Sequence, residues 1–123
     1  MEWTSIIDMA YDCNISIGTE TSTCLVTIQL KDFAGSDLKV KNVVYLYGSS
    51  DAYGNAPAVI TTVTKGTDGD VLILLATYYW MAISEDDGAL DVTVDGNGTT
   101  PFYVNVVLPN GKVVTSEAIT CTS

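Results

Sequence analysis

Residues 24–30 read Cys-Leu-Val-Thr-Ile-Gln-Leu, with an apolar side chain at every second position and Thr27 and Gln29 between them. Side chains two positions apart lie on the same face of an extended chain, so this period predicts a strand with one buried face. The same alternation recurs in residues 90–94 and 102–108. We therefore expect a core that contains Val26, Ile28, Val92, Val94, Val104 and Val106.

Turn-forming residues separate these segments at short intervals. Gly, Asn, Asp and Ser cluster in residues 32–37, 49–55, 66–69, 85–88, 95–98 and 109–111. Segments rich in Val, Ile, Thr and Tyr lie between the clusters, as is typical of strands. About seven core strands result, with residues 14–18 as a possible further one. This pattern predicts an all-β, immunoglobulin-like Greek-key sandwich.

Residues 71–83 are ambiguous, because thirteen residues contain no polar break except Thr77. One helix would fit this length. Two strands, or one long bent strand, fit the aromatic cluster of residues 78–80 better, and we expect Trp80 in the core. The last hairpin is more specific. Pro109 suits the first central position of a type I turn and Gly111 the left-handed position that closes it, which predicts a three-residue loop.

The composition indicates one soluble domain without a disulfide framework. A chain of 123 residues is long enough for one core, and its 47% apolar content suggests that some surface is buried against other chains. The three cysteines, Cys13, Cys24 and Cys121, are an odd and sparse set, so we expect buried free thiols. Cys24 and Cys121 could pair only if the first and last strands were neighbours.

The charge balance excludes several classes of partner. Fifteen acidic residues face five basic ones, a net charge of −10, which disfavours nucleic acid and anionic membrane surfaces. The first ten residues have no basic start and are interrupted by Asp8, so we expect neither a signal peptide nor a membrane span.

The sequence offers little for catalysis. There is no His and no Arg, which removes the commonest general base, metal ligand and anion clamp. Glu85, Asp86 and Asp87 lie in a turn, where solvated charge is the ordinary explanation. Residues 95–106 begin like a calcium loop but lack its Gly and its final Glu. We expect no enzyme, no catalytic residue, no metal and no cofactor.

Binding surfaces are a better hypothesis. Residues 1–22 precede the first strongly alternating segment and are interpreted as an N-terminal docking arm, with residues 23–123 as the Ig-like domain. Five large apolar side chains of this arm are expected to contact a partner: Trp3, Ile6, Ile7, Met9 and Tyr11. Tyr53 lies in a Gly- and Asn-containing loop and is expected to be exposed and available for contact.

Two stretches carry a resemblance to a known group of proteins. Residues 26–38 resemble the opening strand and turn of bacterial and phage Ig-like domains. Residues 102–113 resemble the closing hairpin of small Ig-like virion proteins of tailed bacteriophages. The Cys–Trp–Cys core of antibody domains is missing, because no Cys follows two residues after Tyr103 and Trp80 is out of place.

This resemblance implies a virion structural protein, assembled in the host cytoplasm, that decorates the capsid by protein–protein binding. Its implied partners are the major capsid protein or other virion subunits, together with further copies of itself. The alternative is an Ig-like module of an adhesin or fibre that binds a carbohydrate or receptor, for which Tyr53 would be a contact.

Overall fold

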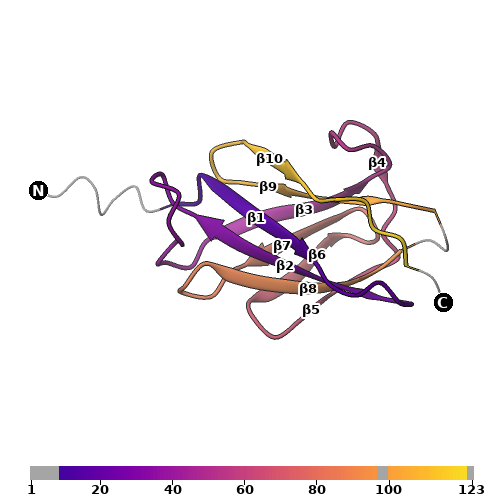
Figure 1. Ribbon diagram of the computed structural model, residues 1–123, viewed down its shortest axis with the longest axis horizontal. Helices are drawn as coiled ribbons and strands as arrows, with labels where there is room; N and C mark the ends of the chain where they lie inside the picture. The colour runs from indigo at the N-terminus through magenta and orange to yellow at the C-terminus, as the bar shows by residue number, and fades with distance from the viewer. Residues whose placement is uncertain (1–8, 97–99, 122–123) are drawn as a thin grey trace, which may run out of the picture.

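The computed structural model describes residues 9–96 and 100–121, and these form two antiparallel sheets packed face to face (Figure 1). The first sheet has the order β1-β2-β8-β5, with β1 Asp12–Ile17, β2 Cys24–Lys31, β8 Ala89–Asp95 and β5 Thr62–Lys65. The second has the order β10-β9-β3-β7-β6, with β10 Val113–Thr115, β9 Tyr103–Val107, β3 Val43–Ser49, β7 Tyr79–Ile83 and β6 Asp70–Leu75. A two-residue strand, β4 (Pro57–Ala58), pairs with the end of β3.

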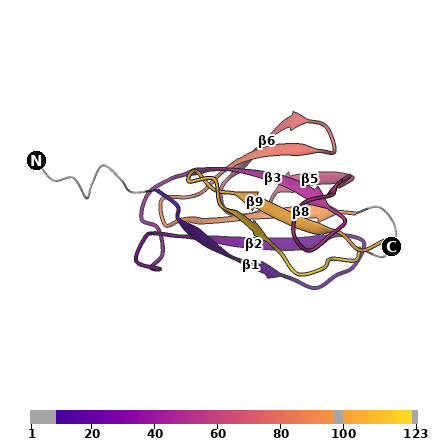
Figure 2. The ribbon, with the colours of Figure 1, turned by 90° about the horizontal axis from the view of Figure 1, so that it is seen from above.

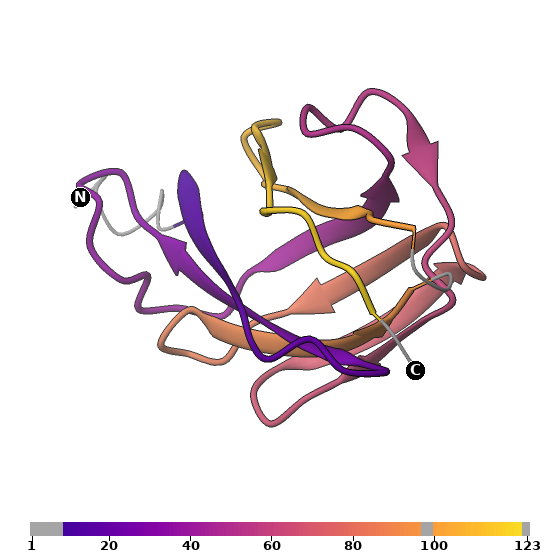
Figure 3. The same cartoon turned by 45° about the vertical axis from the view of Figure 1, so that its right-hand side comes forward.

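Seven of these strands follow the immunoglobulin order. In a constant-type Ig domain one sheet runs A-B-E-D and the other G-F-C. Here β1-β2-β8-β5 and β10-β9-β3 take these places in the same chain order. The prediction of an all-β, Ig-like sandwich of about seven strands is confirmed, and β4, β6 and β7 are additions to it. The β6–β7 hairpin follows β5 along the chain and extends the second sheet beyond β3, as Figure 3 shows from the side.

The core lies between the sheets, where the alternating side chains of both meet. All six residues predicted for it are buried: Val26, Ile28, Val92, Val94, Val104 and Val106. Trp80 is only 1% exposed and is the largest fully buried side chain among the described residues. Each such side chain contributes about 1.5–3 kcal/mol when it leaves water.

Both hairpin predictions are confirmed. Residues 71–83 form two strands, β6 and β7, and not a helix. In the β9–β10 turn, the Leu108 N–H donates to the Lys112 carbonyl (2.8 Å) and the Gly111 N–H donates to the Leu108 carbonyl (2.8 Å). Gly111 has φ +88°, so the three-residue loop closes through a left-handed glycine. The described residues contain no helix, and hence no helix that could cross a membrane.

The predicted division into an arm of residues 1–22 and a domain of residues 23–123 needs a correction. β1 pairs with β2 along its whole length, Ile15 lies opposite Ile28, and the preceding Ala10 is fully buried. Residues 13–17 alternate strictly, with Asn14 and Ser16 between the apolar residues, and this alternation places Cys13, Ile15 and Ile17 against the core. A deletion of residues 2–22 would therefore remove an edge strand of the domain. The domain begins no later than Ala10, so a docking arm can comprise only residues before it.

Candidate binding face

A row of apolar side chains crosses five strands of the second sheet on its outer side. The register places Leu72 opposite Met81, Met81 opposite Tyr45, Tyr45 opposite Val107, and Val107 opposite Val113. Their neighbours along the chain, such as Leu46, Ala82 and Val106, are buried in the core. Because strand residues alternate between faces, the row must lie on the side away from the core.

Further apolar side chains flank this row. On one side the register aligns Leu75, Tyr79 and Tyr47, and on the other Ile83 lies opposite Val43. We call the whole set the apolar face: Val43, Tyr45, Tyr47, Leu72, Leu75, Tyr79, Met81, Ile83, Val107 and Val113. Six of its members are among the large apolar side chains that are more than a third exposed.

The apolar face carries almost no charge. Among all residues of its five strands, Asp70 is the one charged residue, and its carboxylate lies 3.6 Å from the Lys65 Nζ. Both side chains of this pair are well exposed, so the pair contributes little to stability. In a chain of net charge −10, the acidic residues are thus concentrated elsewhere.

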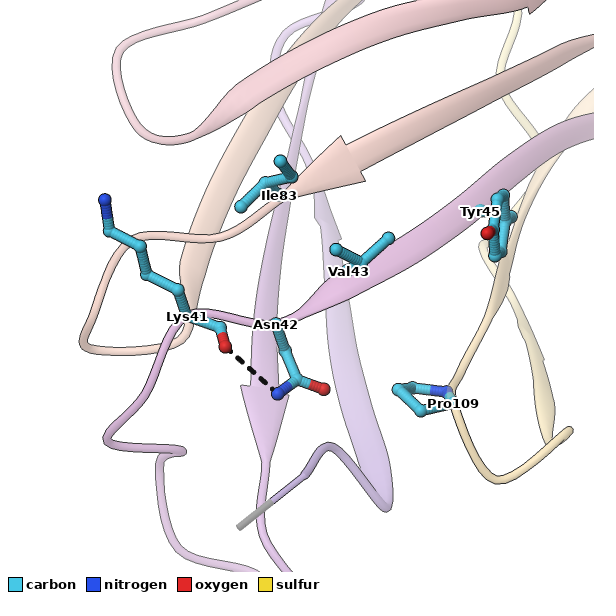
Figure 4. A pocket seen from close by; sticks show the side chains of 6 residues that line it. All are labelled: Lys41, Asn42, Val43, Tyr45, Ile83 and Pro109. Carbon is cyan, nitrogen blue, oxygen red and sulfur yellow. Dashed lines mark hydrogen bonds between the residues drawn. The ribbon is translucent and has the colours of Figure 1, made fainter.

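An open hollow of about 460 Å³ lies at one end of the apolar face. Figure 4 shows Val43 and Tyr45 of β3, Ile83 at the end of β7 and Pro109 of the β9–β10 turn around it. Lys41 and Asn42 complete its rim, and the Asn42 side-chain N–H donates to the Lys41 carbonyl (3.1 Å). Its floor is apolar and its rim bears one cation, which suits an apolar side chain of a partner.

The residues that the sequence placed in a docking arm do not assemble into one described site. Trp3, Ile6 and Ile7 lie outside the described residues. Met9 and Tyr11 are partly buried.

Tyr11 packs within the domain. Its N–H donates to the Lys31 carbonyl (2.9 Å), and its ring meets Phe33 edge-on at 5.5 Å between centroids. Tyr11 therefore packs at the start of β1, and its contact with a partner stays a prediction.

Tyr53 is 79% exposed, as expected. It lies in a loop whose backbone is held by several hydrogen bonds. The Asp51 carboxylate accepts hydrogen bonds from the N–H groups of Asn55 (2.9 Å) and Ala56 (3.1 Å). The Tyr47 hydroxyl donates to the Gly54 carbonyl (2.7 Å). Gly54 has φ +72°, and a Cβ there would approach the Tyr47 hydroxyl to 2.7 Å. Hydrogen bonds thus hold the backbone of the loop that carries Tyr53, and Tyr47 connects this loop to the sheet.

A buried polar group anchors the same loop to the sheet. The Asn105 side-chain N–H donates to the Ser49 hydroxyl (2.9 Å), which donates to the Asp51 carbonyl (2.8 Å). The Thr115 hydroxyl donates to the Asn105 amide oxygen (2.6 Å). Buried polar groups are tolerated when they are paired in this way, and this one has a structural role.

The thiols are unsuited to chemistry at neutral pH. All three cysteines are buried and free, as predicted. Burial raises the pKa of Cys13 to about 12, and it also raises the pKa values of Cys24 and Cys121. A nucleophilic cysteine needs the opposite shift. Within residues 9–96 and 100–121, no three acidic or cysteine side chains gather in a way that could hold a metal ion.

Sequence reasoning missed the apolar face, although a signal for it was present. Residues 43, 45 and 47 and residues 79, 81 and 83 are all apolar or aromatic, as are the core positions between them. A strand that is apolar on both sides is covered on both sides, or it exposes one side to a partner.

Comparisons with known proteins leave the chain without an assigned family. No protein-family model and no curated protein matches it. Among solved structures, a cohesin module from a family 33 glycoside hydrolase of Clostridium perfringens aligns with a TM-score of 0.49 and 10% identity. That alignment covers 93% of this chain and 98% of the module.

Proposed function

We propose that this chain is a non-catalytic structural subunit that binds other proteins through the apolar face. The larger assembly is the virion of a tailed bacteriophage, as the sequence resemblance implies, with the chain bound to the capsid as a decoration or accessory protein. The observation that carries the proposal is the uncharged row Leu72–Met81–Tyr45–Val107–Val113 on the outer side of the second sheet.

The six large apolar side chains of this face that are more than a third exposed support a binding role. Monomeric proteins seldom expose contiguous apolar patches above a few hundred Å² without a functional reason. Interface centres are enriched in Tyr and Met and depleted of charge, and Tyr45, Tyr47, Tyr79 and Met81 lie in the middle strands of the face. Their burial by a partner would stabilise an assembly without an ion pair.

Co-sedimentation of the purified chain with capsids that lack it tests the proposal. Tyr45→Lys places a charge at the centre of the face and is expected to weaken binding at least tenfold, since a charge without a partner would be buried. Leu25→Lys is the matched control. Leu25 is exposed to a similar degree (42% against 47%) but lies on the outer side of the other sheet.

Leu25→Lys is expected to bind like the wild type. Equal binding by both variants would exclude the apolar face as the docking surface. Absence of binding by the wild-type chain would refute the capsid-bound role.

Tyr53 is exposed in a loop held by hydrogen bonds, which favours a second candidate function, that of a carbohydrate- or receptor-binding module. Tyrosine rings stack on sugars as well as on proteins. A glycan array with the wild type and Tyr53→Ala tests this function. Signals that Tyr53→Ala abolishes would support it, whereas an array without signals would exclude glycan binding by this loop.

A further inference from the structure

β6 is an edge strand whose apolar side chains are exposed on both of its faces. Leu72 belongs to the outer face, opposite Met81, and is 55% exposed. Ile73 lies opposite the buried Trp80, so it points to the inner side, and yet it is 61% exposed. A partner that covers only the outer face of the sheet would leave Ile73 in water.

The hairpin reaches beyond the opposite sheet, which explains this exposure. Figure 2 shows β6 at the margin of the molecule, raised from the other strands. On its inner side a groove of about 160 Å³ runs between residues 61–64 of the β5 region and Ile73, with Trp80 at its base. The first sheet ends with β5, whose residues line this groove but leave Ile73 61% exposed.

The other three edges of the sheets have the features that discourage pairing. β1 exposes Asp12, Asn14 and Ser16, β5 exposes threonines and ends at Lys65, and β10 is three residues long. Edge strands are commonly protected by charge or by short length. β6 has six residues, residues 71–75 are all Val, Leu or Ile, and its protective feature is one register shift near its end, between Ile73 and Leu75. Among the described strands, β6 is therefore the edge best suited to pair with another chain.

We propose that β6 pairs antiparallel with β6 of a second copy, across a two-fold axis through Leu72. The second sheet then continues from one copy into the other, and the dimer is closed because both edges are used. The proposal does not depend on the proposed function, since β6 pairing leaves β3, β9 and β10 free to bind a different protein.

The register follows from the side-chain faces. With Leu72 opposite Leu72 of the second copy, Val71 lies opposite Ile73, and outer residues meet outer residues. Leu74 is the extra residue at the register shift between Ile73 and Leu75, and it lies opposite Asp70 of the second copy. The two Asp70 carboxylates are then four residues apart, about 13 Å along the strand. That separation exceeds the Debye length of about 8 Å at physiological salt, so their repulsion is screened.

The low charge of the second sheet allows a second copy as the occupant. Two chains of net charge −10 repel each other over most orientations, but the strands of the second sheet contribute only Asp70 to that charge, so the repulsion is smallest at this edge. Six large apolar side chains lie at or beside this edge and are each more than 40% exposed: Leu72, Ile73, Leu74, Leu75, Tyr78 and Tyr79. Their exposed area is on the order of several hundred Å² per copy, which is smaller than the about 800 Å² per partner of a standard interface but of the same order. Homodimer interfaces are also more apolar than transient ones.

The first experiment is sedimentation equilibrium over a range of concentrations. The wild-type chain is expected to be a dimer, and Leu72→Lys a monomer with an unchanged circular dichroism spectrum. Tyr45→Lys is the control, because it changes the apolar face two strands away from the edge and is expected to remain a dimer. A monomeric wild type, or a dimeric Leu72→Lys, would overturn the proposal. A dimer whose Tyr45→Lys variant loses only capsid binding would separate this inference from the proposed function.

The second experiment tests the register. Leu72→Cys places two thiols opposite each other at the axis, within reach of a disulfide, whereas Ile73→Cys faces Val71 of the second copy. The native cysteines are buried and do not compete. A covalent dimer is expected after mild oxidation for Leu72→Cys and not for Ile73→Cys. Cross-linking through Ile73→Cys alone, or through neither variant, would refute the two-fold axis at Leu72.

Discussion

The outer faces of the two sheets differ sharply, although both are built from residues that favour strands. Across the first sheet the outward register aligns Ser16 with Thr27, and Leu25 with Thr93 and Thr64. Across the second sheet it aligns the five apolar residues from Leu72 to Val113. Thr, Val and Tyr have similar strand preference, so backbone conformation does not explain the difference. What differs is the polarity of the exposed side chains. Those of the first sheet are mostly polar and can be solvated by water, whereas those of the second are apolar and, in our proposal, are covered by another protein.

Thiol reactivity gives the largest expected contrast between the interior and the apolar face. With a pKa of about 12, the Cys13 thiolate is about 10³-fold less populated at pH 8 than that of an ordinary exposed thiol. Val113→Cys adds a thiol to the apolar face, where Val113 is 42% exposed. Alkylation of this variant at pH 8, followed by mass spectrometry, is expected to label the introduced thiol completely before Cys13 reacts. Comparable rates at the two positions would show that the native fold opens readily around β1.

Neighbouring residues of β3 separate the core from the apolar face. Leu46→Ala creates a cavity in the core and is expected to lower the free energy of unfolding by about 2–5 kcal/mol. Tyr45→Ala removes a larger side chain from the outer face and is expected to cost less than about 1 kcal/mol. Urea denaturation of both variants at low protein concentration measures the difference. Equal losses would mean that the apolar face belongs to the stabilising core of the isolated domain.

The pH dependence of stability is the smallest expected effect, and it involves Asp12 in β1 of the first sheet. A hydrogen bond from the Cys13 N–H (2.8 Å), with a further contribution from Lys112, lowers the pKa of Asp12. A lowered pKa in the folded state stabilises the protein above the ordinary value near 4, and this contribution is lost as the pH falls through the folded pKa. Asp12→Asn keeps the acceptor and removes the charge. The Lys112 Nζ lies 3.2 Å from the Asp12 carboxylate, and both side chains of this ion pair are half exposed, so the expected cost at pH 7 is under about 0.5 kcal/mol.

Thermal melts at pH 7 and at low pH check this prediction. The difference between Asp12→Asn and the wild type is expected to vanish once Asp12 is protonated. Tyr45→Thr is the control from the apolar face, and its effect on stability is expected to be independent of pH in this range. A constant difference for Asp12→Asn would place its effect in packing and not in charge.

Much of the sandwich could be predicted from local sequence. The core alternation in β2, β8 and β9 and the Pro109–Gly111 turn depend on neighbouring residues, and the structure confirms both. The arm boundary was wrong because β1 is an edge strand. Its signal was present, because Asn14 and Ser16 alternate with Cys13, Ile15 and Ile17, but it covers six residues against eight in β2 and lies next to the apolar residues interpreted as an arm.

The sequence by itself determined the fold class, the positions of the turns and the core residues of β2, β8 and β9, since alternation and turn chemistry act over a few neighbours. Only the tertiary structure decided that Leu72, Met81, Tyr45, Val107 and Val113 form one row, because that row depends on pairings between segments up to 62 residues apart. It also decided that β6 is an edge strand of the second sheet and that its inward-facing Ile73 stays exposed. A strand is stabilised equally well by a partner strand of its own chain or of another, so its local sequence does not state which one it has.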